Sequence, residues 1–326
     1  MMRRLALIPL LAALALPAPV GCQEAPVARP GGADDAARID AARLLDDVRF
    51  LSSDALAGRR VGSAGNARAR EHILAAFRRI GLEPAADGFT RAFQFTGRRD
   101  SVAYRGVNVV GRVRGTTHPD RYIIVTAHYD HVGIGAPDAA GDSIYNGADD
   151  NASGTAALLA LAAHFQAHRP AHSMIFAALD AEEMGLQGAR AFVRNPPVPL
   201  EAIILNVNLD MVGRNANREL YVAGTHHYPF LKPAVERIAR HAPIRLLTGH
   251  DRPDLPSGQD WTRASDHGAF HAAKIPFLYF GVEDHPDYHR PSDEFDGIQP
   301  DFFADAVETV LAVILELDRD FPAPLP

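Results

Sequence analysis

The chain has 326 residues, of which 47% are hydrophobic and 22% are charged, and this composition excludes disordered, collagenous and coiled-coil proteins. Its formal charge of −7 argues against a nucleic-acid partner, because nucleic-acid-binding surfaces are usually basic. The single cysteine, Cys22, excludes an internal disulfide and any cysteine-rich zinc module. The length allows about two domains or one large α/β domain.

The N-terminus has the layout of a bacterial export signal. Residues 1–4 are short and basic, and residues 5–16 form an apolar run interrupted only by Pro9. This run is too short to span a bilayer, which needs about 20 residues. Residues 1–21 are therefore predicted to be removed, and Gly21-Cys22 resembles a lipoprotein processing box in which the cysteine is acylated. We expect a periplasmic or outer-membrane-anchored lipoprotein, with plain secretion as the alternative.

The rest of the chain alternates between helical and strand patterns. Residues 22–38 are rich in Pro, Gly and Ala and are predicted to be a flexible tether. Strands separated by helices predict a three-layer α/β/α fold with a mostly parallel central sheet, in a single catalytic domain over residues 39–326. The spacing of apolar residues predicts helices at 39–51, 66–80, 153–168 and 301–317, and strands at 89–95, 106–113, 122–127, 174–179, 201–209 and 276–280.

Imidazoles and carboxylates follow the buried strands, where ligand sites of open α/β sheets lie. Almost no lysine or arginine accompanies them, so this many carboxylates would repel one another unless a cation were bound. Imidazole and carboxylate without thiolate suit zinc, with manganese or cobalt as alternatives. Two histidines with three carboxylates exceed one tetrahedral site and suit two ions that share a carboxylate. The segments are 128–131, 146–151, 180–183, 210 and 287–289.

These segments together resemble the co-catalytic zinc aminopeptidases of peptidase family M28. The similarity follows the order of the chain over residues 39–321 and includes residues 58–60 and 81–82. The motifs that carry it are His128-Tyr129-Asp130, the Gly147–Gly154 segment (GADDNASG), Glu182-Glu183, Asp210-Met211 and Tyr288-His289.

The resemblance implies a role for each matching residue. Asp149 corresponds to the bridging carboxylate, His128 and Asp210 to the ligands of one zinc, and Glu183 and His289 to the ligands of the other. Glu182 corresponds to the general base that takes a proton from water. Asp130 corresponds to the carboxylate that orients His128 through its other ring nitrogen. The implied function is a dinuclear zinc exopeptidase that removes the N-terminal residue of peptides with a free amino terminus.

Plainer interpretations remain for several neighbouring residues. Asp150 is expected mainly to cap the following helix. Asp266 is expected to be a helix cap or a group near the site, and Arg59-Arg60 a solvated loop. Among the remaining histidines, His285 is the rival of His289 as a ligand. The others are expected on the surface or in loops, namely His131, His226, His227, His250, His267 and His271.

Three other functions compete with the aminopeptidase. A carboxypeptidase or dipeptidase of the same fold would use the same ligands. A glutaminyl-cyclase-like acyltransferase would use one zinc on a similar scaffold, which the complete set of five ligands disfavours. A non-catalytic lipid-anchored binding protein would have no need of Glu182 as a base. The preferred first residue, the native metal and the oligomeric state are left open.

Overall fold

The computed structural model describes residues 39–98, 100–256 and 258–321. The predicted export signal, Cys22 and the tether lie outside these residues. All described residues belong to one compact unit. Among its helices, none is both long enough and apolar enough to cross a bilayer.

Two amphipathic helices open the described chain. Helix α1 (Ala41–Leu51) begins where the Asp40 carboxylate accepts a hydrogen bond from the backbone N–H of Arg43, at 3.0 Å. Helix α2 (Ala64–Ile80) ends at Gly81, whose φ of 85° favours glycine. Both helices were predicted from the spacing of their apolar residues, which pack toward the sheet.

A mixed sheet forms the centre of the fold. Its strands follow the order β1-β3-β7-β4-β8-β11-β9-β10, with β2 beside β3. Strands β7, β4, β8 and β11 pair in parallel, whereas β3 pairs antiparallel with β7 and β9 pairs antiparallel with β11. The predicted α/β class is confirmed, with the parallel pairing concentrated in the central strands. The bounds are β1 Glu83–Pro84, β2 Thr90–Thr96, β3 Ala103–Val113, β4 His118–His128, β7 His172–Leu179, β8 Ile203–Leu209, β9 Glu219–Ala223, β10 Arg245–Thr248 and β11 Phe277–Gly281.

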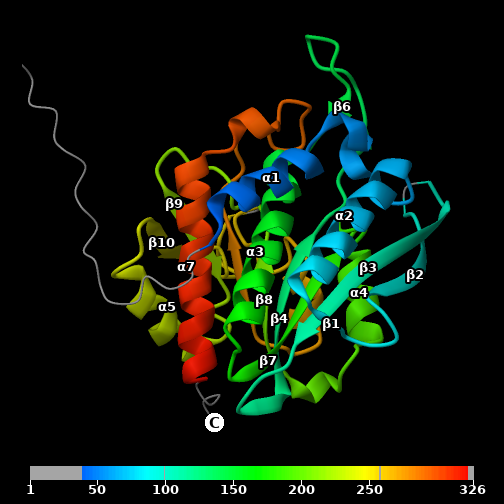
Figure 1. The fold of residues 1–326 in the computed structure, drawn as a ribbon. Coiled ribbons are helices and arrows are strands. Elements are labelled where there is room, and N and C mark those ends of the chain that lie inside the picture. Colours follow the sequence, from blue (N-terminus) through cyan, green and yellow to red (C-terminus); the bar gives the residue numbers. More distant parts are fainter. Residues whose placement is uncertain (1–38, 99, 257, 322–326) are drawn as a thin grey trace, which may run out of the picture. The chain divides into compact units, whose positions relative to one another are not determined.

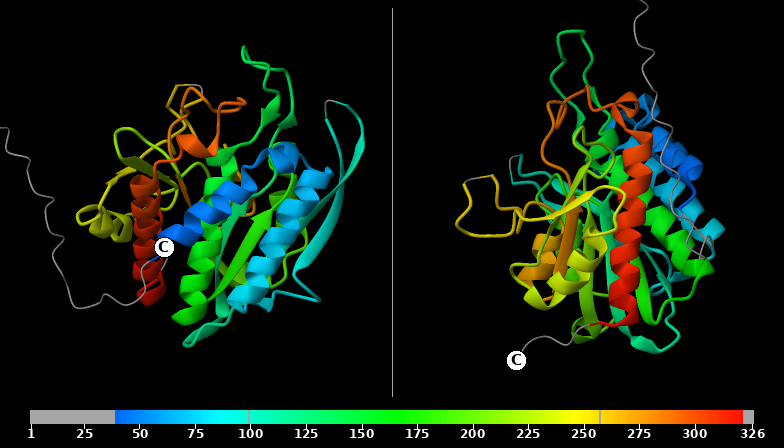
Figure 2. Two further views of the ribbon diagram at one scale, coloured as in Figure 1. Left: turned by 45° about the horizontal axis from the view of Figure 1, so that its top comes forward. Right: turned by 90° about the vertical axis from the view of Figure 1, so that its left-hand side faces the viewer.

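The central strands are apolar on both sides because each face of the sheet is covered. In β4, Ile123 and Val125 contact one core while Ile124 contacts the other. Helices α1, α2, α3 (Gly154–Ala167) and α7 (Pro300–Arg319) lie in front of the sheet in Figure 1. Helices α4 (Gln187–Arg194) and α6 (His267–Ala272) pack on the opposite face, and the edge-on view in Figure 2 shows helices on both sides.

Several short elements carry too weak a pattern to be predicted. Strands β9 and β10 and helix α5 (Lys232–Ala239) extend the sheet and its front layer beyond β11. A separate two-stranded hairpin pairs β5 (Gly133–Ile134) with β6 (Ile144–Tyr145), and it projects beyond the sheet in Figures 1 and 2. These elements have two to eight residues, which is too short for a clear periodicity.

Candidate metal centre

The central parallel strands deliver the candidate ligands to one edge of the sheet. His128 is the last residue of β4, and Asp210 directly follows β8. Glu182 and Glu183 lie in the turn after β7, and His289 lies in the loop after β11. Because carboxyl ends of parallel strands meet at one edge, segments far apart in sequence converge here.

Two groups of potential metal ligands form at this edge, and Asp150 belongs to both. One group contains His128, Asp150 and Asp210. His128 Nε2 lies 3.3 Å from Asp150 Oδ1 and 3.4 Å from Asp210 Oδ1. The second group contains His131, Asp150, Glu183 and His289.

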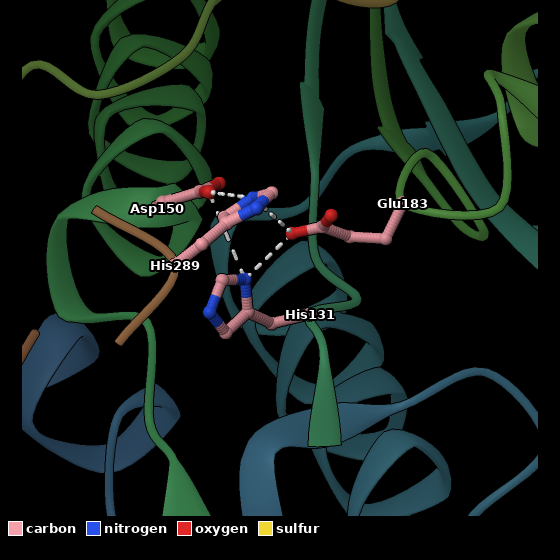
Figure 3. A group of neighbouring side chains, drawn as sticks. All are labelled: His131, Asp150, Glu183 and His289. Carbon is pink, nitrogen blue, oxygen red and sulfur yellow. Dashed lines mark ion pairs between the residues drawn. The ribbon is translucent and has the colours of Figure 1, made fainter. Parts of the chain in front are cut away.

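Figure 3 shows the side chains of the second group pointing toward one another. His289 Nε2 lies 3.0 Å from Asp150 Oδ2 and 3.3 Å from Glu183 Oε1. The two oxygens of Asp150 therefore face different groups, which is the arrangement of a carboxylate that bridges two ions.

The expectation that Asp149 bridges the two groups is corrected in favour of Asp150. Asp149 is buried, but its Oδ1 accepts a hydrogen bond from Gly213 N–H at 2.7 Å. Its Oδ2 lies 3.2 Å from His285 Nε2, away from both ligand groups. The backbone of the turn Ala148–Ser153 is extended at Asp150, with φ −101° and ψ 95°, so the two adjacent carboxylates point in different directions.

The expected capping role of Asp150 is likewise wrong, because its carboxylate faces the histidines. Burial opposes its ionisation, but His131, His128 and His289 outweigh burial and hold the pKa of Asp150 well below its usual range. The backbone of this turn is held by Asp293. Its carboxylate accepts hydrogen bonds from Asp149 N–H at 3.0 Å and Asp150 N–H at 3.0 Å.

Asp130 connects the two ligand-bearing turns. Its buried carboxylate accepts hydrogen bonds from the backbone N–H of Glu182 at 3.0 Å and of Glu183 at 3.4 Å. Its Oδ1 lies 3.7 Å from His128 Nδ1, whereas its own backbone oxygen is closer to that nitrogen, at 3.2 Å. Asp130 thus lies where it can orient both His128 and the glutamate turn.

His131 was expected on the surface or in a loop, and Arg59 in a solvated loop. His131 does lie in a loop, but both side chains are buried within the site. His131 is 1% exposed and belongs to the second ligand group. The sequence feature that could have indicated a site role for His131 was its position directly after Asp130, three residues beyond the end of a buried strand. Arg59 is completely buried, and burial lowers its pKa to about 10.

The Arg59 guanidinium donates hydrogen bonds only to backbone carbonyls. Its partners are Leu51 at 2.6 Å, Tyr129 at 3.0 Å, Gly147 at 3.0 Å, and Asn146. It joins the end of α1 to the loops that carry His131 and Asp150. Its positive charge also lies close enough to Asp130, Asp150 and Glu183 to interact with them.

The chemistry of the donor set fits divalent cations. Burial raises the pKa of Glu182 and Asp210, so their ionised forms are disfavoured in the protein without a cation. Glu183 Oε1 and Asp210 Oδ1 are buried without a hydrogen-bond partner among the described residues. Cations placed in the two groups would satisfy these oxygens and offset their repulsion.

Asp266 is also buried beside this centre. Both of its oxygens lack a hydrogen-bond partner within residues 39–98, 100–256 and 258–321, and it makes no capping hydrogen bond. Burial raises its pKa to about 7. Of its two expected roles, the helix cap is therefore wrong and the position near the site is observed.

Two cavities adjoin the candidate centre. A small cavity of about 60 Å³ is lined by Glu182 and by ligands of both groups, with Met211, Trp261, Tyr279 and Val282 as its apolar wall. A larger cavity of about 530 Å³ lies beside Glu183 and His289, and Arg60 and Arg98 line it. His289 borders both cavities, so the ligand groups lie between them.

Comparison with known proteins identifies the family. Residues 108–314 match the sequence model of peptidase family M28. Aminopeptidase YwaD of Bacillus subtilis is 31% identical over 225 residues, covering 64% of this chain and 44% of the relative. The chain therefore spans less than half the length of that relative.

Solved structures show the same fold. BSAP, a zinc aminopeptidase from Bacillus subtilis, superposes with a TM-score of 0.68 at 18% identity, covering 84% of this chain and 94% of that one. A Bacteroides thetaiotaomicron glutaminyl cyclase gives a TM-score of 0.69 at 20% identity, with coverage of 86% and 98%. Because the family match extends over more than half of the residues and includes the strands that carry the ligands, this chain belongs to peptidase family M28.

Proposed function

We propose that the protein is a metallo-aminopeptidase that uses two zinc ions to remove the first residue of peptides. The observation that supports this most is the division of the Asp150 oxygens between two ligand groups beside Glu182. His128, Asp150 and Asp210 would hold one ion, and Asp150, Glu183 and His289 the other. Bound there, the ions would supply a nucleophilic hydroxide at neutral pH and polarise the scissile carbonyl.

Glu182 is the residue suited to proton transfer. It lines the small cavity beside both groups without belonging to either of them. Burial raises the pKa of its carboxyl group, which makes it a better proton acceptor. Glu182 would accept the proton of the attacking water and donate it to the departing amine, while Asp130 fixes its backbone N–H.

The cavities favour an exopeptidase that acts on the amino end. The small cavity has no lysine or arginine among its lining residues, but it has several carboxylates, including the exposed Asp284. It therefore suits an ammonium group and not a terminal carboxylate. Its apolar wall suits an apolar first side chain. The rest of the peptide would extend into the larger cavity, past Arg60 and Arg98.

The test compares peptides that differ only at the amino terminus. The purified chain is loaded with Zn²⁺ and incubated with Leu-, Lys- and Gln-initiated tetrapeptides, each free or N-acetylated, and products are identified by mass. We expect sequential loss of first residues from free peptides only, fastest with leucine, and inhibition by 1,10-phenanthroline. Release of the last residue from acetylated peptides would overturn the proposal in favour of a carboxypeptidase.

A matched variant tests the role of Glu182. Glu182→Gln keeps the size of the side chain but cannot accept a proton at neutral pH. We expect turnover to fall by about 10²–10⁴-fold while metal content is unchanged. Full activity in this variant would exclude Glu182 as the base. Loss of ammonia from the Gln-initiated peptide without cleavage would instead indicate a cyclase.

A further inference from the structure

His131 is the more buried of the two histidines in the second ligand group. It follows β4 and Asp130 in the loop leading to the β5–β6 hairpin, and only 1% of its surface is exposed. By contrast, the side chain of His289 in the same group is 40% exposed. In Figure 3 the His131 ring points from its loop toward Glu183 and Asp150.

Both ring nitrogens of His131 lack a hydrogen-bond partner among the described residues. His131 Nδ1 lies 2.7 Å from Glu183 Oε1, but Oε1 also lacks a partner in hydrogen-bonding geometry. A buried polar group without a hydrogen-bond partner destabilises the folded protein. The structure thus places His131 Nδ1 at ion-pair distance from Glu183 Oε1 without the geometry of a hydrogen bond, which is how two ligands of one cation lie.

The spacing of four atoms fits a single cation. Nitrogen and oxygen ligands lie about 2.1 Å from zinc, which places the corners of a tetrahedral site about 3.4 Å apart. His131 Nδ1 lies 2.7 Å from Glu183 Oε1 and 3.8 Å from Asp150 Oδ2. His289 Nε2 lies 3.0 Å from Asp150 Oδ2 and 3.3 Å from Glu183 Oε1. These distances lie on both sides of the tetrahedral value.

We propose that His131 Nδ1 is a fourth protein ligand of the cation held by Asp150, Glu183 and His289. This inference rests on the proposed metal-dependent function and goes beyond the five ligands that the family resemblance implies. The two ion positions then differ, since the His128 position has three protein ligands and the His131 position has four. Four ligands describe a closed, tightly held ion, whereas three leave a position open for water or substrate.

A difference in affinity between the two ions follows from this asymmetry. The position with His131 should fill first and release its ion last. The position with His128, Asp150 and Asp210 should fill second and exchange more readily. Catalysis would then be limited by occupancy of the three-ligand position when zinc is scarce.

The experiment titrates the metal-free full-length chain with Zn²⁺ in the presence of a competing chelator. Wild-type protein should bind two ions with clearly different affinities. His131→Ala and His131→Gln should weaken the tighter step by at least about 100-fold, since even residues outside the ligand set cost 10–100-fold. The weaker step should change little. Substitution by Co²⁺ should show altered visible absorption of the first ion bound by either variant.

A buried histidine far from the centre provides the control. His172 is 7% exposed, and its Nδ1 lies 3.0 Å from Asp318 Oδ1 at the start of β7, the end of the strand opposite the glutamate turn. His172→Ala should keep both binding steps. Unchanged Zn²⁺ affinities and Co²⁺ spectra in both His131 variants would overturn the inference, and His131→Gln serves if the alanine variant fails to fold.

The same experiment separates this inference from the proposed function. If wild-type protein binds two ions and cleaves peptides but His131 proves dispensable for the tighter step, only the fourth ligand is rejected. If the wild-type chain binds no ion at either position, the metallo-aminopeptidase itself is rejected, and the fourth ligand with it.

Discussion

At the scale of single residues, the structure distinguishes two neighbouring carboxylates with opposite tasks. Asp150 faces the histidines of both ligand groups, while Asp149 contacts Gly213 and His285. Asp149 therefore supports the loop after β8 and belongs to neither ligand group. The difference matters chemically, because only a carboxylate that belongs to both ligand groups could bridge two cations.

Paired amide substitutions test this distinction. Asp150→Asn removes the shared negative charge, so we expect weakened binding of both ions. Asp149→Asn retains an oxygen for Gly213 N–H and should keep both ions, with a loss of stability of about 1 kcal/mol. Elemental analysis after equilibrium dialysis against dilute Zn²⁺ provides the measurement. Retention of both ions by Asp150→Asn, with their loss from Asp149→Asn, would restore Asp149 as the bridge.

At the scale of elements, the site is built from loops that come from separate parts of the chain, and Arg59 connects three of these parts. Its one guanidinium donates hydrogen bonds to carbonyl oxygens of α1, of the loop after β4 and of the turn before α3. A planar group with five N–H donors suits this task, whereas an ammonium cannot reach all four carbonyls.

Loss of Arg59 should therefore destabilise the fold. Arg59→Met removes the side-chain donor of four buried carbonyls, of which only Gly147 O keeps a backbone donor among the described residues, and it removes the positive charge near the carboxylates, so we expect a loss of about 3–5 kcal/mol in the free energy of unfolding. Arg59→Lys should be intermediate. Arg60→Met, at the exposed neighbouring position, should change stability by less than about 0.5 kcal/mol. Urea denaturation checks this, and similar midpoints for both methionine variants would contradict it.

At the scale of the whole molecule, a fully buried histidine contributes to the dependence of stability on pH. His267 is fully buried against Phe277 and Tyr279, and Tyr279 lines the small cavity. The Nε2 of His267 lies 2.7 Å from the carbonyl oxygen of Trp261. Burial lowers the pKa of His267 to about 3. The unfolded chain takes up a proton on this ring near pH 6.5, whereas in the folded protein the ring stays neutral until the pH falls to about 3.

The buried His267 makes the folded protein less stable at acidic pH. Because the folded pKa lies below the unfolded one, the stability contributed by neutral His267 is present above about pH 6.5 and is lost as the pH falls toward 3. At pH 5 the loss amounts to about 2 kcal/mol relative to pH 7.5. His267→Gln cannot titrate, so its unfolding free energy, measured by urea denaturation with chelator present, should fall less between these pH values. Parallel pH profiles for the two proteins would rule out His267 as the cause.

Local patterns along the chain determined much of this protein. Runs of apolar residues identified the central strands, and the polar residues that follow them identified the edge of the sheet where the candidate site lies. The segments that bear His128, Glu182, Glu183, Asp210 and His289 were predicted because strand ends are encoded locally.

Only the tertiary structure decided which side chains of those segments face the centre. The choice between Asp149 and Asp150 depends on the extended backbone inside one turn, which Asp293 holds from a distant loop. The burial of His131 and Arg59 depends on loops that converge from separate elements. A sequence pattern records the spacing of residues along the chain, whereas the direction of a side chain in a loop is set by long-range contacts that have no local period.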